Sequence, residues 1–228
     1  MNASFTRSAV SLLTRLGTHL EVEGIENLPP DGGFIIVSNH LGRLDVILVY
    51  AFLQRPDITV MVAEKYRKYA IFRWFVKKLD SIWVDRFNAD FSAMRVALNR
   101  LKRGSILVIA PEGTRSKSEE LIEAKPGSSY LAAKAGAPVV PVALTGTEDR
   151  VVVERLKHLR RPRIQVRIGE SFVFPPLNSR DRDTVLKTYT DEMMCRIAAL
   201  LPANYRGFYA NPPRTRELLQ ETRTGSGY

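Results

Sequence analysis

The chain has 228 residues, 45% of them hydrophobic and 25% charged, as is usual for a globular protein of one or two domains. Its 34 Lys and Arg outnumber 24 Asp and Glu, and the net charge of +10 favours an anionic partner: nucleic acid, a phosphorylated substrate or an acidic membrane surface. The single cysteine, Cys195, excludes an internal disulfide and a cysteine-based zinc cluster, and the three scattered histidines argue against a catalytic zinc.

The first 20 residues contain only a short apolar run between Arg7 and Arg15, which is too short for the core of a signal peptide. No stretch of 18 residues in the chain is both apolar and uncharged, so we also expect no membrane-spanning helix. These two observations predict a protein that stays in the cytoplasm.

Short apolar runs alternate with helical patterns from residue 33 to residue 201. The predicted strands are 33–38, 58–63, 81–84, 105–110, 139–144 and 163–168, and the predicted helices are 44–54, 66–78, 90–103, 127–135 and 181–201. Four of the strands are almost continuously apolar, as strands buried on both faces are. The alternation predicts a single-domain α/β fold with a mostly parallel or mixed central sheet and helices on both faces.

Capping residues support several of these helix boundaries. Asn88 or Asp90 can cap the third helix, Asp181 or Asp183 can start the last, and glycines end the third and fourth. The tail from Ala203 is polar, with a Pro pair and a Gly-Ser-Gly end, and we expect it to lie along the surface or to be disordered.

The motif NHLGRLD, residues 39–45, follows directly on a buried-looking strand and opens a helix. In an open α/β sheet, such a turn is where ligands and catalytic groups collect. His40 and Asp45 are five residues apart, so on one straight helix they would point about 140° apart. They can meet if His40 lies in the turn and Asp45 in the first helical turn. The alternative is a surface histidine beside an ordinary first-turn acid.

A second motif, APEGTRS, comprises residues 110–116 and follows the most apolar strand. It is expected at the same edge of the sheet as His40. Gly113 permits close backbone approach, and Arg115 can make a bidentate contact with a phosphate. Taken alone, this segment is equally an ordinary turn with a solvated arginine.

Together the motifs resemble the glycerolipid acyltransferase family, which includes lysophosphatidic acid and glycerol-3-phosphate acyltransferases. Four blocks occur in the family's order: NHLGRLD, SIWVDR ending at Arg86, APEGTRS, and a stretch from Lys125 to Leu144 that contains Pro141 in a strand. The resemblance covers about half of the chain, and four ordered motifs are far more specific than one.

The chain departs from the family pattern at three positions that bear on the shape of the acceptor pocket. Gly42, followed by Arg43, stands where the family usually has a small hydroxyl residue; Asp80 stands where a glycine is expected; and Ala110 replaces an aromatic residue before PEGTRS. The ionisable and phosphate-binding positions are kept.

The resemblance implies that His40 is a general base, which deprotonates an acceptor hydroxyl for direct attack on an acyl thioester. Asp45 would orient His40 and stabilise the imidazolium that forms. No metal and no cofactor are implied, because a thioester is already activated, and acyl-CoA or acyl-carrier protein serves as co-substrate. Cys195, beside two methionines, is interpreted as a buried structural thiol.

The resemblance also implies an acceptor site. Arg86 and Arg115 would bind the acceptor phosphate, with Lys125 a weaker candidate. Gly113 and Thr114 would shape the loop, and Glu112 would position the acceptor.

The implied reaction transfers a fatty acyl chain to the free hydroxyl of 1-acylglycerol 3-phosphate and gives phosphatidic acid. Glycerol 3-phosphate or another lysolipid is the alternative acceptor. Such substrates imply an enzyme peripherally associated with the inner face of the membrane. We divide the chain into an amphipathic segment, an acyltransferase domain and a C-terminal tail: residues 1–20, 21–202 and 203–228.

Residues 65–103 carry eleven basic residues against three acidic ones, with interleaved aromatic residues. This composition suits an interfacial segment on a membrane lipid surface, and the N-terminal segment is a weaker candidate. The ordinary alternative is that these aromatic residues pack the core. A basic nucleic-acid-binding protein would share the charge but leaves both motifs unexplained, so we expect no nucleic-acid partner. A catalytically inactive lipid-binding protein is disfavoured by the intact His40 and Asp45.

Overall fold

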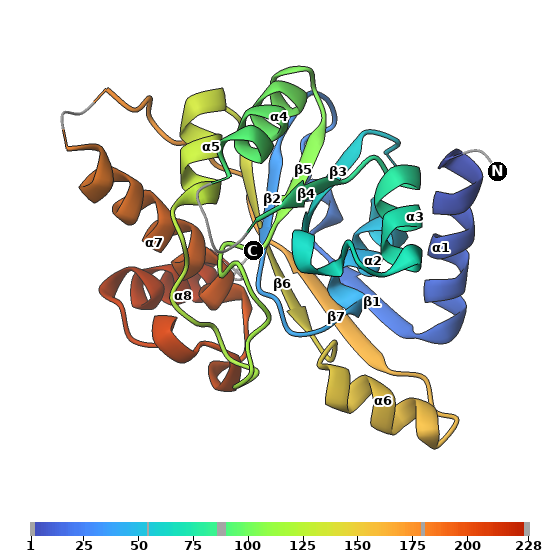
Figure 1. Cartoon of the computed structure of the whole chain (residues 1–228). Coiled ribbons are helices and arrows are strands. Elements are labelled where there is room, and N and C mark those ends of the chain that lie inside the picture. The colour runs from blue at the N-terminus through green and yellow to red at the C-terminus, as the bar shows by residue number, and fades with distance from the viewer. Residues whose placement is uncertain (1–2, 54, 86–89, 179–180, 226–228) are drawn as a thin grey trace.

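The computed structural model describes residues 3–53, 55–85, 90–178 and 181–225. Within these ranges seven strands form one sheet, in the order β1-β7-β6-β2-β5-β3-β4 (Figure 1). The strands are β1 (His19–Glu23), β2 (Ile35–Ser38), β3 (Ile58–Ala63), β4 (Ile82–Val84), β5 (Ile106–Ile109), β6 (Val139–Thr145) and β7 (Arg163–Ile168). Neighbouring strands are parallel except β6 and β7, so the sheet is mixed.

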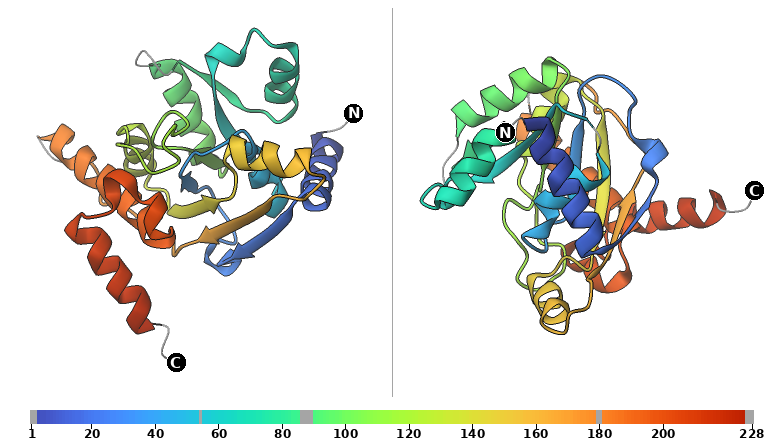
Figure 2. Two further views of the ribbon diagram at one scale, coloured as in Figure 1. Left: turned by 90° about the horizontal axis from the view of Figure 1, so that it is seen from below. Right: turned by 90° about the vertical axis from the view of Figure 1, so that its right-hand side faces the viewer.

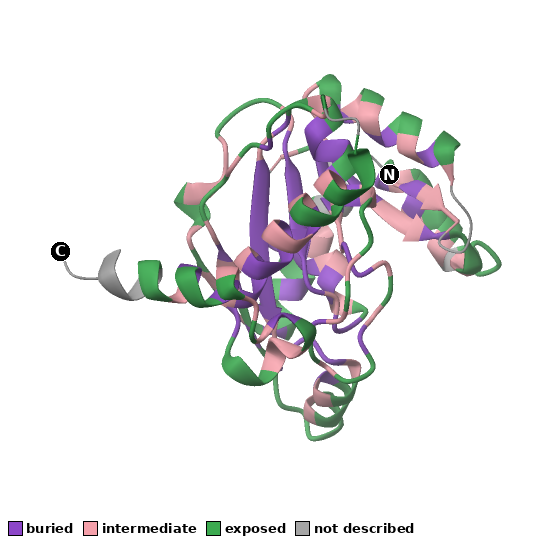
Figure 3. Ribbon diagram, turned by 90° about the vertical axis from the view of Figure 1, so that its left-hand side faces the viewer, coloured by how far each residue is buried: buried purple, intermediate pink, exposed green. Residues whose placement is uncertain are grey.

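Helices cover both faces of the sheet (Figures 1 and 3). The helices packed into the two cores are α1 (Ala3–Gly17), α2 (Leu44–Phe52), α3 (Ala70–Lys78), α4 (Phe91–Lys102), α5 (Gly127–Ala135), α7 (Arg182–Leu200) and α8 (Pro213–Gly225). Ile35 and Val37 of β2 point into the core formed with α4, α5 and α7, whereas Ile36 points into the core formed chiefly with α2. This alternation follows from the two-residue period of a strand. The mixed sheet with helices on both faces confirms the predicted α/β fold class.

Each predicted strand and helix has an observed counterpart, but β1 and three described α-helices, α1, α6 and one in the tail, were not predicted as such. β1 is a half-exposed edge strand of alternating character, which gives no apolar run to recognise. It begins at His19, inside the segment assigned to residues 1–20. The residues before it form the amphipathic helix α1, and α6 (Asp149–Lys157) follows β6. The helix predicted at 66–78 instead begins at Ala70, because Tyr69 is extended.

The predicted caps are found where the structure describes them. The Asp90 side chain accepts a hydrogen bond from the backbone N–H of Ala93 and starts α4, and Asp181 does the same for α7 through Thr184. Asn88 lies outside the described residues.

The described part of the tail, residues 203–225, is folded on the surface of the protein, so only the disordered alternative is wrong. It forms two short 3₁₀ turns, Ala203–Tyr205 and Gly207–Tyr209, and then helix α8 (Pro213–Gly225). Tyr209 is only 1% exposed and joins the core beside α7. A few well-spaced apolar side chains hold this segment, although its average composition is polar.

Candidate active site

The His40–Asp45 pair lies at the carboxyl end of β2. His40 Nδ1 is 2.7 Å from Asp45 Oδ2, and the same oxygen accepts hydrogen bonds from the backbone N–H groups of Leu41 and Gly42. The turn before α2 therefore brings the two side chains together, as the spacing allowed. Because Asp45 is buried and faces Nδ1, it favours the imidazole tautomer with a proton on Nδ1 and a basic Nε2.

Glu112 connects the two motif loops. Its carboxylate is 2% exposed and accepts hydrogen bonds from the backbone N–H of His40 at 2.9 Å and of Ile122 at 3.2 Å. A further bond runs from the Ser116 N–H to the His40 carbonyl, at 2.9 Å. Burial raises the pKa of Glu112 to about 7, although the two backbone hydrogen bonds act in the opposite direction. Glu112 thus fixes the backbone of His40.

Arg115 is engaged within the protein. Its guanidinium donates to Asp149 Oδ2 at 2.5 Å and to the Tyr66 hydroxyl at 3.2 Å. The other oxygen of Asp149 accepts the backbone N–H of Arg43 at 2.9 Å. Asp149, at the start of α6, therefore ties the NHLGRLD loop to the APEGTRS loop.

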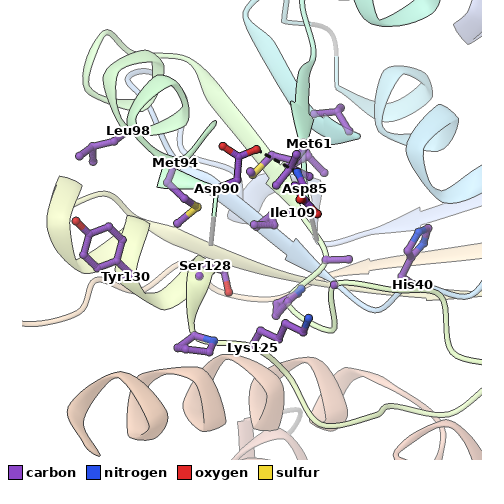
Figure 4. Close-up of a pocket in the computed structure, with 18 of the residues that line it drawn as sticks. His40, Met61, Asp85, Asp90, Met94, Leu98, Ile109, Lys125, Ser128 and Tyr130 are labelled. Carbon is purple, nitrogen blue, oxygen red and sulfur yellow. Dashed lines mark hydrogen bonds between the residues drawn. The ribbon is translucent and has the colours of Figure 1, made fainter. Parts of the chain in front are cut away.

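A cavity of about 860 Å³ begins at His40 and extends between α4, α5 and the sheet (Figure 4). Figure 4 shows His40 at one side and Leu98 and Tyr130 at the other, with Lys125 between them. Most of the lining is apolar, with Met61, Met94 and Leu98 among the contributing side chains. The site thus combines a basic imidazole with space for a long apolar group.

A smaller hollow of about 260 Å³ adjoins this cavity, and Gly113 and Lys125 line both. The hollow is also lined by Thr114 and by Lys65, which lies directly after β3. Gly113 has φ of 68°, a left-handed conformation that favours glycine, so its loop needs this residue. The charged lining of the hollow consists of two lysines and of the acidic residues Glu64, Asp85 and Glu112. The lysines are therefore the groups that can attract a phosphate here.

Comparison with known proteins agrees with this geometry. The family model described as Acyltransferase matches residues 19–145, more than half of the chain. The chain belongs to the acyltransferase family. A 1-acyl-sn-glycerol-3-phosphate acyltransferase of Bacillus subtilis (strain 168) is 32% identical over 142 residues, which are 62% of this chain and 70% of that protein.

Two other similar proteins have related names. The 1-acyl-sn-glycerol-3-phosphate acyltransferase BAT2 of Brassica napus, which is chloroplastic, is 30% identical over 56% of this chain, but only 37% of that protein is covered. The crystal structure of the 1-acyl-sn-glycerophosphate acyltransferase PlsC from Thermotoga maritima superposes with a TM-score of 0.61. The two sequences are 25% identical, and the superposition covers 83% of this chain and 77% of the Thermotoga chain.

The structure brings most of the predicted site residues of the acyltransferase to one edge of the sheet. They are His40, Asp45, Glu112, Gly113, Thr114, Arg115 and Lys125. Arg86 lies outside the described residues. Sequence reasoning missed Lys65, Tyr66 and Asp149. Their position in the sequence could have indicated them. Each follows soon after the end of a strand that runs in the same direction as β2, and His40 and Glu112 also follow the ends of such strands.

Two departures from the family pattern have local explanations. Gly42 packs directly on the backbone of Thr147, and a Cβ there would collide with the Thr147 carbonyl oxygen. A serine therefore does not fit this loop conformation. Asp80 has φ of 52°, which is why glycine suits the position, and its carboxylate pairs with Arg100 at 2.9 Å.

The C-terminal segment supports the loop that carries Lys125. Leu121 donates its N–H to the Tyr205 carbonyl at 2.8 Å and accepts the Phe208 N–H at 2.9 Å. The Ala124 N–H donates to the Tyr209 hydroxyl at 3.2 Å. This part of the acyltransferase lies beyond the matched residues 19–145 and yet contacts the site directly.

The remaining predictions concern metals, membranes and Cys195. Among the described residues, no three His, Cys, Asp or Glu side chains gather as a metal ion would require. The described helices are too short or too polar to cross a bilayer. In the 65–103 stretch, Tyr69 and Trp74 are exposed whereas Phe75 packs against a core. Cys195 is buried, and burial raises its thiol pKa, as expected for a structural cysteine.

Proposed function

We propose that this acyltransferase moves a fatty acyl group from a CoA or acyl-carrier-protein thioester to 1-acylglycerol 3-phosphate, giving phosphatidic acid. The observation that carries the proposal is the His40–Asp45 pair at the border of a large apolar cavity. The names of the Bacillus and Thermotoga relatives, both 1-acylglycerol-phosphate acyltransferases, support the choice of acceptor.

The proposed chemistry uses His40 Nε2 as a general base. Nε2 takes the proton of the acceptor hydroxyl as the hydroxyl oxygen bonds to the thioester carbonyl carbon. Asp45, hydrogen-bonded to Nδ1, stabilises the positive charge that appears on the ring. The tetrahedral intermediate then breaks its C–S bond, and the proton passes from His40 to the departing thiolate. The products are an ester and a free thiol.

The acyl chain of the donor would occupy the apolar cavity, with its carbonyl beside His40. The side chains of Met61, Met94 and Leu98 offer the chain an apolar lining. Apolar burial contributes about 0.8 kcal/mol for each CH₂ removed from water, so the cavity can bind and orient a long chain.

The acceptor phosphate would bind in the smaller hollow, which Lys65 and Lys125 line. Arg115 would contribute from the neighbouring loop, and its pairing with Asp149 fixes the guanidinium in place. Arg86 follows Asp85, which lines the same hollow, and we retain it as a phosphate ligand on sequence grounds. Glu112 would position the acceptor indirectly, through the backbone of His40.

We further propose that the enzyme works at the surface of a membrane, since both acceptor and product are bilayer lipids. Exposed apolar side chains on α1, namely Leu12, Leu13 and Leu16, favour such contact, as do Tyr69 and Trp74 near the basic helix α3.

The decisive experiment measures transfer from labelled acyl-CoA and from acyl-carrier protein by the purified protein. The acceptors are 1-acylglycerol 3-phosphate, glycerol 3-phosphate and a monoacylglycerol that lacks phosphate, each in detergent. We expect His40→Ala to reduce turnover by about 10²–10⁴-fold. The matched control is His158→Ala, because His158 is an exposed histidine that also faces a carboxylate.

The outcomes separate the parts of the proposal. Wild-type turnover in His40→Ala would overturn the mechanism. Equal activity on the acceptor without phosphate would overturn the phosphate-binding roles. A clear preference for glycerol 3-phosphate would replace the proposed acceptor by its alternative.

A further inference from the structure

Helix α6 and its end carry three apolar side chains with a large exposed surface, Val153, Leu156 and Leu159, which we call the ridge. The helix follows the carboxyl end of β6 and projects from the body of the molecule (Figures 1 and 2). Val152 is buried and faces the protein. On the outside, Val153 is 46% exposed, Leu156 53% and the following Leu159 96%. Val153 and Leu156 are neighbours three residues apart on the helix, and Leu159 follows its end.

The end of α6 places Leu159 in an unusual conformation. The Leu159 N–H bonds to the Leu156 carbonyl at 3.0 Å, and the Arg160 N–H bonds to the Arg155 carbonyl at 2.9 Å, which together form a Schellman turn. The residue in the left-handed position of this turn is usually glycine, but here it is Leu159, with φ of 54°. A leucine at this position carries backbone strain and exposes its whole side chain. Neither feature benefits the isolated fold.

The sequence around the ridge is basic, although Arg150 pairs with Glu119 at 3.0 Å and Arg163 lies in β7. Residues 150–163 contain six Lys and Arg and one acidic residue, Glu154. The basic residues are Arg150, Arg155, Lys157, Arg160, Arg161 and Arg163. An aliphatic ridge among long basic side chains matches the boundary of an anionic bilayer, where apolar groups enter the acyl region and cations meet lipid phosphates.

We propose that the tip of α6, residues 153–161, docks the enzyme on an anionic lipid bilayer, with Leu159 inserted below the headgroups. This inference rests on the proposed function, because the acceptor and product are anionic lipids. A ridge with one protruding leucine suits a fluid surface better than a shaped protein groove. The opposite end of α6 holds Arg115 through Asp149, about 13 Å away along the helix axis, so docking would bring the acceptor loop close to the bilayer.

The first test compares wild type with Leu159→Asn. Binding is measured by co-sedimentation with vesicles of phosphatidylcholine and phosphatidylglycerol, and folding is measured by Tm. Asparagine tolerates the left-handed conformation, so we expect Tm to rise. Loss of the inserted side chain should weaken vesicle binding by about tenfold. A role in folding alone would instead lower Tm and leave binding unchanged, and that result would overturn the proposal.

The second test examines charge. Arg160→Glu combined with Arg161→Glu should weaken vesicle binding by about fivefold or more for each residue. The matched control is Lys102→Glu with Arg103→Glu, which changes net charge equally at the end of α4, next to the amino end of β5. Equal loss of binding in both double variants would overturn the proposal, because only total charge would then matter.

The third test separates docking from catalysis. Transfer to a short-chain, water-soluble acceptor should be unchanged in the α6 variants, whereas transfer to vesicle-embedded acceptor should fall. If the wild type fails to acylate any acceptor, the proposed function is overturned while vesicle binding still judges the docking site. If Leu13→Asn weakened vesicle binding and Leu159→Asn did not, the docking site would be α1 and not α6. If the α6 variants bound vesicles normally but lost binding to acyl-carrier protein, the occupant of the α6 tip would be a protein and not a bilayer.

Discussion

The two loops that form the active site are held in different ways. In the NHLGRLD loop, Asp45 Oδ2 is bonded to His40, Leu41 and Gly42, all within five residues. In the stretch from Glu112 to Lys125, Leu121 and Ala124 are held instead by the C-terminal segment, some 80 residues along the chain. The His40–Asp45 contact is therefore formed within the first loop, which Glu112 and Asp149 also tie to the rest of the fold, whereas the second loop depends on the C-terminal segment. We infer that proton transfer and acceptor binding can be disturbed separately.

Asp45→Asn should have the largest effect, because it acts on the locally held pair. Asparagine keeps an oxygen for the backbone N–H groups of Leu41 and Gly42 but removes the charge that stabilises the His40 imidazolium. We expect kcat to fall by about a hundredfold or more, with little change in acceptor KM. Initial rates with acceptor in detergent, together with Tm, provide the check.

The matched control for this variant is Glu154→Gln. Glu154 also faces a histidine, His158, at 3.0 Å, but both side chains are exposed on α6. Its kcat in detergent should equal that of the wild type. A wild-type kcat in Asp45→Asn would show that the carboxylate contributes nothing to the reaction.

Glu112 joins the two loops, and its titration should make stability depend on pH. Burial raises its pKa from 4.5 to about 7, so between these values the folded protein holds a proton that the unfolded chain releases. The free energy of unfolding should therefore fall as pH rises from 4.5 to 7, by about 3 kcal/mol from this group. In Glu112→Gln this part of the slope should disappear, which urea unfolding at pH 5, 6, 7 and 8 measures.

The control for the titration is Glu192→Gln. Burial raises the pKa of Glu192, but hydrogen bonds from Arg214 and Arg196 outweigh it and the net shift is downward. Its contribution to stability is complete above pH 4.5, so this substitution should leave the slope above pH 5 unchanged. A slope in Glu112→Gln equal to that of the wild type would contradict the buried, protonatable Glu112.

Tyr209→Phe should have the smallest effect, and it acts on the distantly held loop. It removes the acceptor of the Ala124 N–H, which we expect to cost about 1–2 kcal/mol of stability. The loop carrying Lys125 then loses its support, so acceptor KM should rise a few-fold while kcat changes little. Steady-state kinetics with varied acceptor, beside urea unfolding, would measure both.

Tyr189→Phe serves as the comparison, because the Tyr189 hydroxyl also bonds to the backbone, at the Pro175 carbonyl. It should change neither kinetic constant. If Tyr209→Phe lowered kcat as strongly as it raised KM, the separation of the two loops would be wrong.

The sequence determined the features that depend on near neighbours. Apolar runs and capping residues such as Asp90 and Asp181 placed most strands and helices within a few residues. The spacing of His40 and Asp45 allowed their contact, because a turn followed by a helix fixes both side chains locally. The α/β class followed from the alternation of elements, since both faces of each central strand must be covered.

Only the tertiary structure decided what depends on distant partners. Lys65, Asp149 and Tyr209 reach the site because parallel strands end at one edge of the sheet and because the C-terminal segment packs beside it. Strand β1 and the tail gave weak signals, since a half-exposed edge strand or a few buried side chains among polar ones barely alter local composition. The cavity is bounded by α4, α5 and α7, and no local pattern encodes how these helices pack together.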